Sequence, residues 1–335
     1  MGPSREVSPK GPHTFDSIKA TPMQQPIPLP LGLNPEQLAH YQQVFNLSYH
    51  LNYLEVCRQR IPLQGLDVLE VGGAMPASLV IDQLGCNSWT GVEAPSYDKE
   101  LGKANQFHRN AGDSDQQQRH QGRYRHIYLN IEEIPQDHYG QYDLIFSIAC
   151  FEDIARLPLA LEVMHRCLKP GGKLFTMHSP IWSAFDGHHL PVGIPERFDR
   201  NDPDRKQIFG PWGHLLQTRQ QTYQDISTRF DREFAEEIIY YTYNSNHINR
   251  YFSEDYFSVF QGSAFDVIEH QVTFPFNPDS VVQHALEQRY PGYTQFGNNG
   301  VLAVLERSEI SKLISPDSSK IEKFDCFIRK DNVIF

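Results

Sequence analysis

The sequence predicts an α/β fold: a mainly parallel sheet with helices on both faces. The prediction depends on short apolar runs, on the longer amphipathic segments between them, and on the order in which the two alternate. The apolar runs are Leu66–Val71, Trp89–Val92, His126–Leu129, Asp143–Ala149 and Lys173–Met177, with helices expected near 76–85, 97–110 and 154–168. Buried strands that alternate with helices form βαβ units, whose strands run parallel. At about 150 residues per domain, 335 residues allow two domains or one enlarged α/β domain.

Composition narrows the class of protein. Lys and Arg number 30 and Asp and Glu 41, for a formal charge of −11, which argues against a nucleic-acid partner. No apolar stretch approaches about 18 residues, so no membrane span is expected, and the N-terminus lacks the apolar core of a secretory signal. The five cysteines are scattered, which favours neither a disulfide framework nor a thiolate zinc site. A soluble, cytoplasmic protein is expected.

The two ends of the chain differ from its middle. The first 35 residues hold eight of the 23 prolines, so residues 1–33 are predicted to form a flexible or wrapped arm, which would allow a homo-oligomer. Asn34 and Pro35 suit the start of a helix that is expected to run to about Arg58. Residues 34–307 are predicted to form the main domain and 308–335 a polar tail.

A long aromatic stretch, Ser179 to about Phe252, follows the fifth apolar run. It is predicted to form a cap or lid beside the fifth strand, since aromatic side chains line many ligand pockets. Trp182, Phe185 and Trp212 are the candidate substrate-binding aromatics, although the same side chains could build a small core for the cap itself. Residues 240–243 alternate as an edge strand would, and 265–273 and 301–306 are expected to be the last two strands.

The first strand ends at a possible nucleotide-binding turn. Glu70 is followed by Gly72 and Gly73, and glycines let the backbone approach a ligand that a Cβ would block. Glu93 closes the second strand, where a carboxylate can accept the hydroxyls of a ribose. Either feature alone is common in structural turns and at solvated strand ends. Together, in this order and spacing, they favour an adenosine-type ligand.

These residues resemble motif I of class I S-adenosylmethionine-dependent methyltransferases. Over about residues 65–178, Tyr142–Ile154 also resembles the family's fourth strand and following helix, and Leu168–Phe175 (LKPGGKLF) its turn into strand five. Two departures stand out: Ala74 and Pro76 replace glycines of the family's turn, and Asn130 stands where an aspartate is usual. The resemblance implies a Rossmann-like sheet of seven strands and S-adenosylmethionine as cofactor.

The resemblance also implies roles for individual residues. Glu70 would orient the amino-acid part of the cofactor, Gly72 and Gly73 would give backbone access, and Glu93 would hold the ribose. Asn130 and Ile131 would hold the adenine, and Ser147 would lie near the methionine moiety.

Histidines near the end of the fifth strand are candidate bases. Methyl transfer to a hydroxyl benefits from a general base, for which histidine is suited. The residues singled out are His178 at the strand end as an acceptor contact, His188 or His189 as the base with Asp186 or Glu152 to orient it, and His247 as a second candidate. Polar loop residues and a helix-capping histidine are the competing interpretations. The same groups could also bind a metal, but their spacing matches no known signature.

The leading hypothesis is a methyltransferase that uses S-adenosylmethionine to methylate a small molecule, most plausibly on oxygen. Ser179–Trp182 and Gly187–His189 resemble a subgroup that acts on small molecules or sugars. One alternative is a non-catalytic binding or scaffold protein of this fold, suggested by the altered glycine turn. A further alternative is an NAD-dependent oxidoreductase, which shares the strand–turn–acid pattern but not the LKPGG turn.

Overall fold

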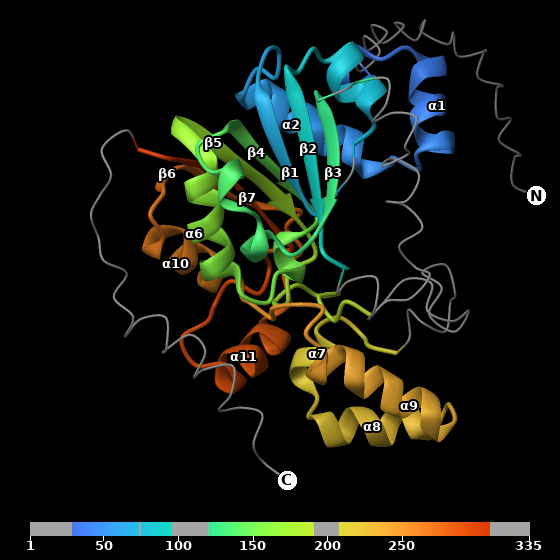
Figure 1. Cartoon of the computed structure of the whole chain (residues 1–335). Coiled ribbons are helices and arrows are strands. Elements are labelled where there is room, and N and C mark those ends of the chain that lie inside the picture. Colours follow the sequence, from blue (N-terminus) through green and yellow to red (C-terminus); the bar gives the residue numbers. More distant parts are fainter. Residues whose placement is uncertain (1–28, 74, 96–119, 121, 191–207, 309–335) are drawn as a thin grey trace, which may run out of the picture.

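The computed structural model describes residues 29–73, 75–95, 120, 122–190 and 208–308 (Figure 1). Its sheet has seven strands in the order β3-β2-β1-β4-β5-β7-β6. The strands are β1 (Asp67–Val71), β2 (Ser88–Glu93), β3 (Tyr124–Tyr128), β4 (Tyr142–Ile148), β5 (Leu168–His178), β6 (Asp266–Thr273) and β7 (Gly300–Glu306). All neighbours pair in parallel except β7, which is antiparallel to both β5 and β6. The predicted seven-stranded α/β sheet is confirmed.

Helices cover both faces of this sheet. The helices are α1 (Pro35–Val44), α2 (Tyr49–Arg60), α6 (Leu157–Cys167), α7 (Gly213–Leu216), α8 (Arg219–Ser227), α9 (Arg232–Ile239), α10 (Ser253–Gly262) and α11 (Ser280–Arg289). Short helical turns include η2 (Ser78–Gln83), η4 (Ile131–Glu133), η6 (Phe151–Asp153) and η9 (Tyr240–Asn244). The expected helix over 97–110 lies outside the described residues, as do residues 1–28, 191–207 and 309–335.

The single helix predicted from residue 34 to 58 is wrong in one respect, because the segment forms two helices. Asn34 caps α1 as expected, with its side chain accepting from the Gln37 amide and the Gln37 side chain returning the contact. The chain then turns at Asn46, whose φ of 55° is incompatible with a continuous helix. Before α1, Leu31 and Leu33 are buried, so this end of the predicted arm packs onto the domain.

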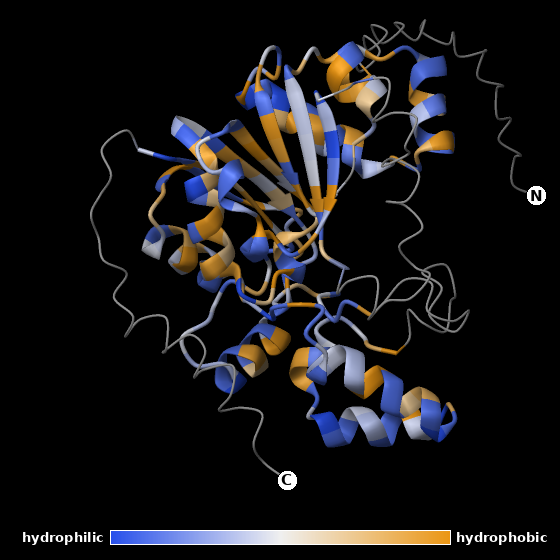
Figure 2. Ribbon diagram, in the orientation of Figure 1, coloured by the Kyte–Doolittle hydropathy of each residue, from blue (hydrophilic) through white to orange (hydrophobic). Residues whose placement is uncertain are grey.

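The two faces of the sheet bury different side chains of the same strands. One face packs Leu69, Ile145 and Leu174 under α6 and α10, and the other packs neighbouring Val68 and Phe146 under α2 and η2. This alternation follows from the two-residue period of a strand. Figure 2 shows hydrophobic residues concentrated along the strands. Both faces are therefore covered, which explains why the strands read as continuous apolar runs.

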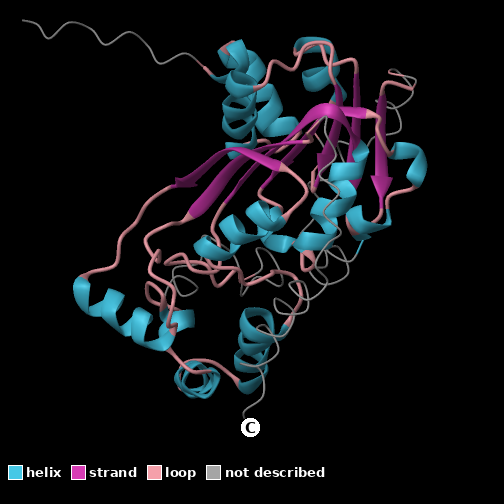
Figure 3. Ribbon diagram, turned by 90° about the vertical axis from the view of Figure 1, so that its left-hand side faces the viewer, coloured by secondary structure: helices cyan, strands magenta, loops and turns pink. Residues whose placement is uncertain are grey.

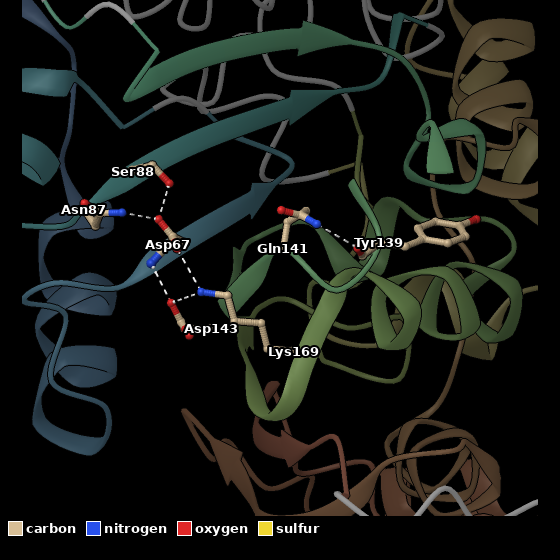
Figure 4. A network of polar contacts seen from close by, with 7 residues as sticks. All are labelled: Asp67, Asn87, Ser88, Tyr139, Gln141, Asp143 and Lys169. Atoms are coloured by element: carbon tan, nitrogen blue, oxygen red, sulfur yellow. Dashed lines mark hydrogen bonds and ion pairs between the residues drawn. The ribbon is translucent and has the colours of Figure 1, made fainter. Parts of the chain in front are cut away.

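The LKPGG turn places Lys169 at the amino-terminal edge of the sheet, where it contacts Asp67 and Asp143 (Figure 4). Lys169 Nζ lies 2.9 Å from a carboxylate oxygen of Asp67 and 2.9 Å from one of Asp143. Asp67 also accepts hydrogen bonds from Asn87 (2.6 Å) and Ser88 (2.7 Å). Burial alone would raise the pKa of Asp67, but the bonds from Lys169, Ser88 and Asn87 outweigh burial and lower this pKa. This motif thus joins β1, β4 and β5 at the edge opposite their carboxyl ends.

A layer of helices lies beyond the carboxyl ends of the strands (Figures 1 and 3). Helices α7, α8 and α9 belong to the stretch 179–252, which we call the cap, and α11 comes from a second insertion between β6 and β7. No sequence signal predicted α11. The possible edge strand predicted at residues 240–243 is wrong, because this segment continues helically from α9.

Candidate active site

The turn after β1 is folded tightly against two neighbouring side chains. Gly72 has φ of 83°, and a Cβ added there would lie 2.1 Å from Cys150 Sγ. A Cβ added at Gly73 would lie 2.6 Å from Glu70 Oε1. The Gly72 amide donates to the Val92 carbonyl at 2.9 Å, which ties the turn to β2. Glycine is therefore required at position 72 apart from any ligand, and a Cβ at position 73 would displace the Glu70 carboxylate.

Glu70 holds this turn in place. One carboxylate oxygen accepts hydrogen bonds from the Met75 amide (2.8 Å) and from the indole nitrogen of Trp89 (2.6 Å). Burial raises the pKa of Glu70 to about 7, and these two bonds oppose the increase. The contacts of Glu70 thus fix the loop that would carry the amino-acid part of a cofactor, and its direct contact with a cofactor stays a prediction.

The other predicted cofactor residues lie along the same edge. Glu93 is buried at the end of β2, beside the glycine turn, because Val71 of β1 pairs with Val92. Asn130 follows β3, and its amide nitrogen lies 3.3 Å from the Glu133 carboxylate, while Ile131 is buried in the core beneath α6. Ser147 is fully buried and donates to the Val71 carbonyl at 2.9 Å. The turn, Glu93 and Asn130 thus line one edge, and Ser147 cross-links β4 to β1.

The segment after β4 contains a buried acid. Ala149 adopts φ of 44°, an uncommon conformation that often marks functional sites, and η6 then places Glu152 in the interior. Burial, reinforced by the charge of Asp153, raises the pKa of Glu152 well above its usual range. Its Oε2 has no hydrogen-bond partner in the described part of the chain.

Asn249 connects the cap to this segment. Its side-chain amide donates to the carbonyls of Phe151 (2.6 Å) and Ile154 (3.2 Å), and its backbone amide donates to the Glu152 carbonyl (2.8 Å). Its own carbonyl oxygen accepts from the Tyr256 hydroxyl at 3.1 Å. Through its side chain and its backbone, Asn249 thus bonds four polar groups and fixes residues 247–251 against the segment that follows β4.

His178 ends β5 in an apolar environment. The ring is fully buried, with its centroid 4.7 Å from that of Tyr256 and 5.7 Å from that of Phe151. Burial, reinforced by the nearby rings of His270 and His189, lowers the pKa of His178 to about 3. Nδ1 lies 3.2 Å from the Thr176 hydroxyl, whereas Nε2 has no partner among the described residues. His178 is therefore a neutral ring at the carboxyl edge.

Three further histidines each donate Nε2–H to a backbone carbonyl. His189 bonds to Pro180, His247 bonds to His189 at 2.8 Å, and His214 bonds to Trp182 at 2.8 Å. Because a carbonyl only accepts, each neutral ring carries its lone pair on Nδ1. Burial lowers the pKa of His247 and that of His214 to about 4.

Two predicted candidate bases, His188 and His189, lie in the first part of the cap, and the third, His247, bonds to the His189 carbonyl from the end of the cap. Gly187 makes the placement of His188 and His189 possible, because a Cβ there would lie 2.2 Å from the Ile181 carbonyl oxygen. The His188 ring lies beside Phe209 and His214, and its Nδ1 accepts from the Leu190 amide at 3.3 Å. His247 uses its second nitrogen on the Ser245 hydroxyl, so both ring nitrogens are hydrogen-bonded, and the role of His247 as a base stays a prediction.

The predicted substrate aromatics lie in the cap's own packing. The Trp212 indole nitrogen donates to the carbonyls of Ser183 (3.2 Å) and Phe296 (3.1 Å), and Phe185 packs on Trp212. Trp182 belongs to the same cluster. The interpretation of these rings as a core for the cap is thus the one their contacts favour, and their binding of substrate stays a prediction.

In residues 29–73, 75–95, 120, 122–190 and 208–308, no group of three or more His, Cys, Asp or Glu side chains could hold a metal ion. The same segments contain no helix with the length and apolar character needed to cross a bilayer.

Known proteins that resemble this chain include methyltransferases. Residues 84–176 match a family profile described as a methyltransferase domain, and no curated protein sequence matches the chain. Similar solved structures include an S-adenosylmethionine-dependent methyltransferase from Mesorhizobium loti (12% identity, 78% of this chain and 100% of the other, TM-score 0.41). Another is phosphoethanolamine N-methyltransferase 2 of Haemonchus contortus in complex with S-adenosyl-L-methionine (14%, 82% and 57%, TM-score 0.44).

The family match and the strand order confirm the predicted class I methyltransferase fold and enzyme class, with S-adenosylmethionine as the cofactor of that class. Sequence reasoning missed three residues near the candidate site: Asn249, His214 and Arg250. The one available signal was that Asn249 and Arg250 follow His247 in a polar run. The side-chain bonds of Asn249 reach residues 98 and 95 positions away, whereas those of Arg250 reach only 8 and 5 positions back.

Proposed function

We propose that this enzyme transfers the methyl group of S-adenosylmethionine to a hydroxyl oxygen of a small molecule, with His189 as the general base. The observation that carries the proposal is the setting of His189. Its φ of 45° is unusual for a residue other than glycine, and its Nε2–H is held by the Pro180 carbonyl. A base whose far nitrogen is fixed by an acceptor has a defined tautomer and orientation.

The arrangement of the edge supports a transfer reaction there. The glycine turn and Glu93 stand at the ends of β1 and β2, whereas His178 ends β5 and the loop that carries His189 follows it. In open α/β sheets, ligands bind outside the carboxyl ends of the strands. The cofactor supplies a methyl group that is already activated, so the chain has to align the acceptor and remove its proton.

Two measurements test this function in order. Isothermal titration of the full chain with S-adenosylmethionine should show binding, and no heat at millimolar concentration would favour the scaffold alternative. Methyl transfer from radiolabelled cofactor is then assayed on a panel of hydroxylated small molecules. His189→Gln should reduce the rate by about 10²–10⁴-fold and leave cofactor affinity unchanged.

A matched control is available on α6. His165→Gln removes a histidine from a helix that covers the sheet, and it should leave the methyl-transfer rate unchanged. An undiminished rate in His189→Gln would remove this residue as the base, and His188 would be the next candidate. A cytoplasmic location and a homo-oligomer stay predictions.

A further inference from the structure

Arg250 is a cation of the cap that has no acidic partner among the described residues. It lies three residues after His247, is only partly exposed, and adopts φ of 58°. Its guanidinium donates to the Thr242 carbonyl (Nε, 3.0 Å) and to the Ser245 carbonyl (Nη2, 2.9 Å). These two bonds fix the plane of the group but do not neutralise its charge.

The electrostatic surroundings of Arg250 include a second cation, Arg219. Acidic residues outnumber basic ones by 41 to 30, yet no carboxylate lies within ion-pair distance of Arg250 in the described structure. Burial, reinforced by the positive charge of Arg219, lowers the pKa of Arg250 to about 10. The group remains charged at neutral pH, and a partly desolvated cation next to another cation favours an anion.

The position of Arg250 links it to the candidate site. Its guanidinium carbon lies 5.6 Å from the centroid of the Trp182 ring. The preceding residue, Asn249, is bonded to the end of β4, and His247 donates to the His189 carbonyl. The segment that carries Arg250 is therefore anchored to both the strand edge and the loop of the candidate base.

We propose that Arg250 binds an anionic group of the methyl acceptor, so that the substrate is a hydroxylated carboxylate or phosphate rather than a neutral alcohol. The planar guanidinium presents its remaining N–H groups as a fork that matches two oxygens of either anion. The assignment to the acceptor depends on the proposed function, whereas the anion site can be tested by itself.

The test measures thermal unfolding of the full chain in sodium phosphate, sodium acetate and sodium chloride at equal ionic strength and pH. An anion that binds the folded state raises the midpoint, by about 5 °C at 100 mM for a dissociation constant near 1 mM. Phosphate also stabilises proteins non-specifically, so the decisive quantity is the excess of the wild type over Arg250→Gln. Arg250→Gln should weaken anion binding by about 10- to 100-fold.

Arg229→Gln is the matched control, because Arg229 is a cap arginine that is already paired with Asp225 at 2.8 Å. It should keep the full anion response. Arg250→Lys retains a charge without the fork and should keep part of the anion response. This variant keeps the proposal testable if Arg250→Gln fails to fold. Equal anion responses in the wild type and both Arg250 variants would overturn the proposal.

Acetate and phosphate distinguish the two possible kinds of acceptor. A response to acetate indicates a carboxylate acceptor, and a response to phosphate indicates a phosphorylated acceptor. Titration of Arg250→Gln with S-adenosylmethionine separates this inference from the proposed function. Normal cofactor binding with a lost anion response supports the inference. Absent cofactor binding in the wild type would instead refute the proposed function while leaving the anion site intact.

Discussion

Gly72→Ala is the most informative perturbation of the cofactor turn. The new methyl group would have to occupy a position 2.1 Å from Cys150 Sγ and 2.5 Å from Cys150 Cβ, in a residue with φ of 83°. The left-handed conformation costs an alanine about 1–2 kcal/mol, and the overpacking adds about 1–3 kcal/mol. We therefore expect the free energy of unfolding to fall by about 2–5 kcal/mol, and cofactor affinity to fall with it.

Gly140→Ala separates the two contributions. Gly140 has a similar φ of 67°, but a Cβ there would meet nothing within 4 Å, so only the conformational cost of about 1–2 kcal/mol applies. Urea unfolding of both variants measures the difference. In a Cys150→Gly background, Gly72→Ala should cost no more than Gly140→Ala, because the steric part is removed. Equal costs for the two alanine variants in the native background would refute the close approach of Gly72 and Cys150.

Three further predictions concern stability. Because Glu70 has a raised pKa of about 7, against an ordinary value of 4.5, the folded state binds more protons than the unfolded state between these values. Stability should therefore fall by about 3 kcal/mol as pH rises from 4.5 to 7, and Glu70→Gln should remove this part of the pH dependence in urea unfolding. Lys169→Met leaves Asp67 and Asp143 without their shared cation, so we expect a loss of about 1 kcal/mol with unchanged S-adenosylmethionine affinity; impaired binding would contradict a purely structural role for the LKPGG turn. Asn249→Leu leaves the carbonyls of Phe151 and Ile154, after β4, without their donor, which should destabilise the fold by at least about 2 kcal/mol and abolish methyl transfer; unfolding and activity close to wild type would show that this connection is dispensable.

The sequence alone determined the sheet, because local signals specify it. The apolar runs placed the strands, and the glycine turn after β1 fixed the edge at which a ligand would bind. These features need only the period of a strand and the conformational freedom of glycine, which are properties of neighbouring residues. The strand order confirms the predicted sheet.

The tertiary structure decided the chemistry of the cap. The histidines were visible in the sequence, but their carbonyl partners were not, since a backbone oxygen carries no residue-specific signal. His247 finds its partner 58 residues away and Asn249 finds one 98 residues away. The aromatic stretch likewise could not reveal whether its rings pack together or face a ligand, because both arrangements bury the same apolar area. Arg250 could be recognised only once the absence of a neighbouring carboxylate in the described structure was known.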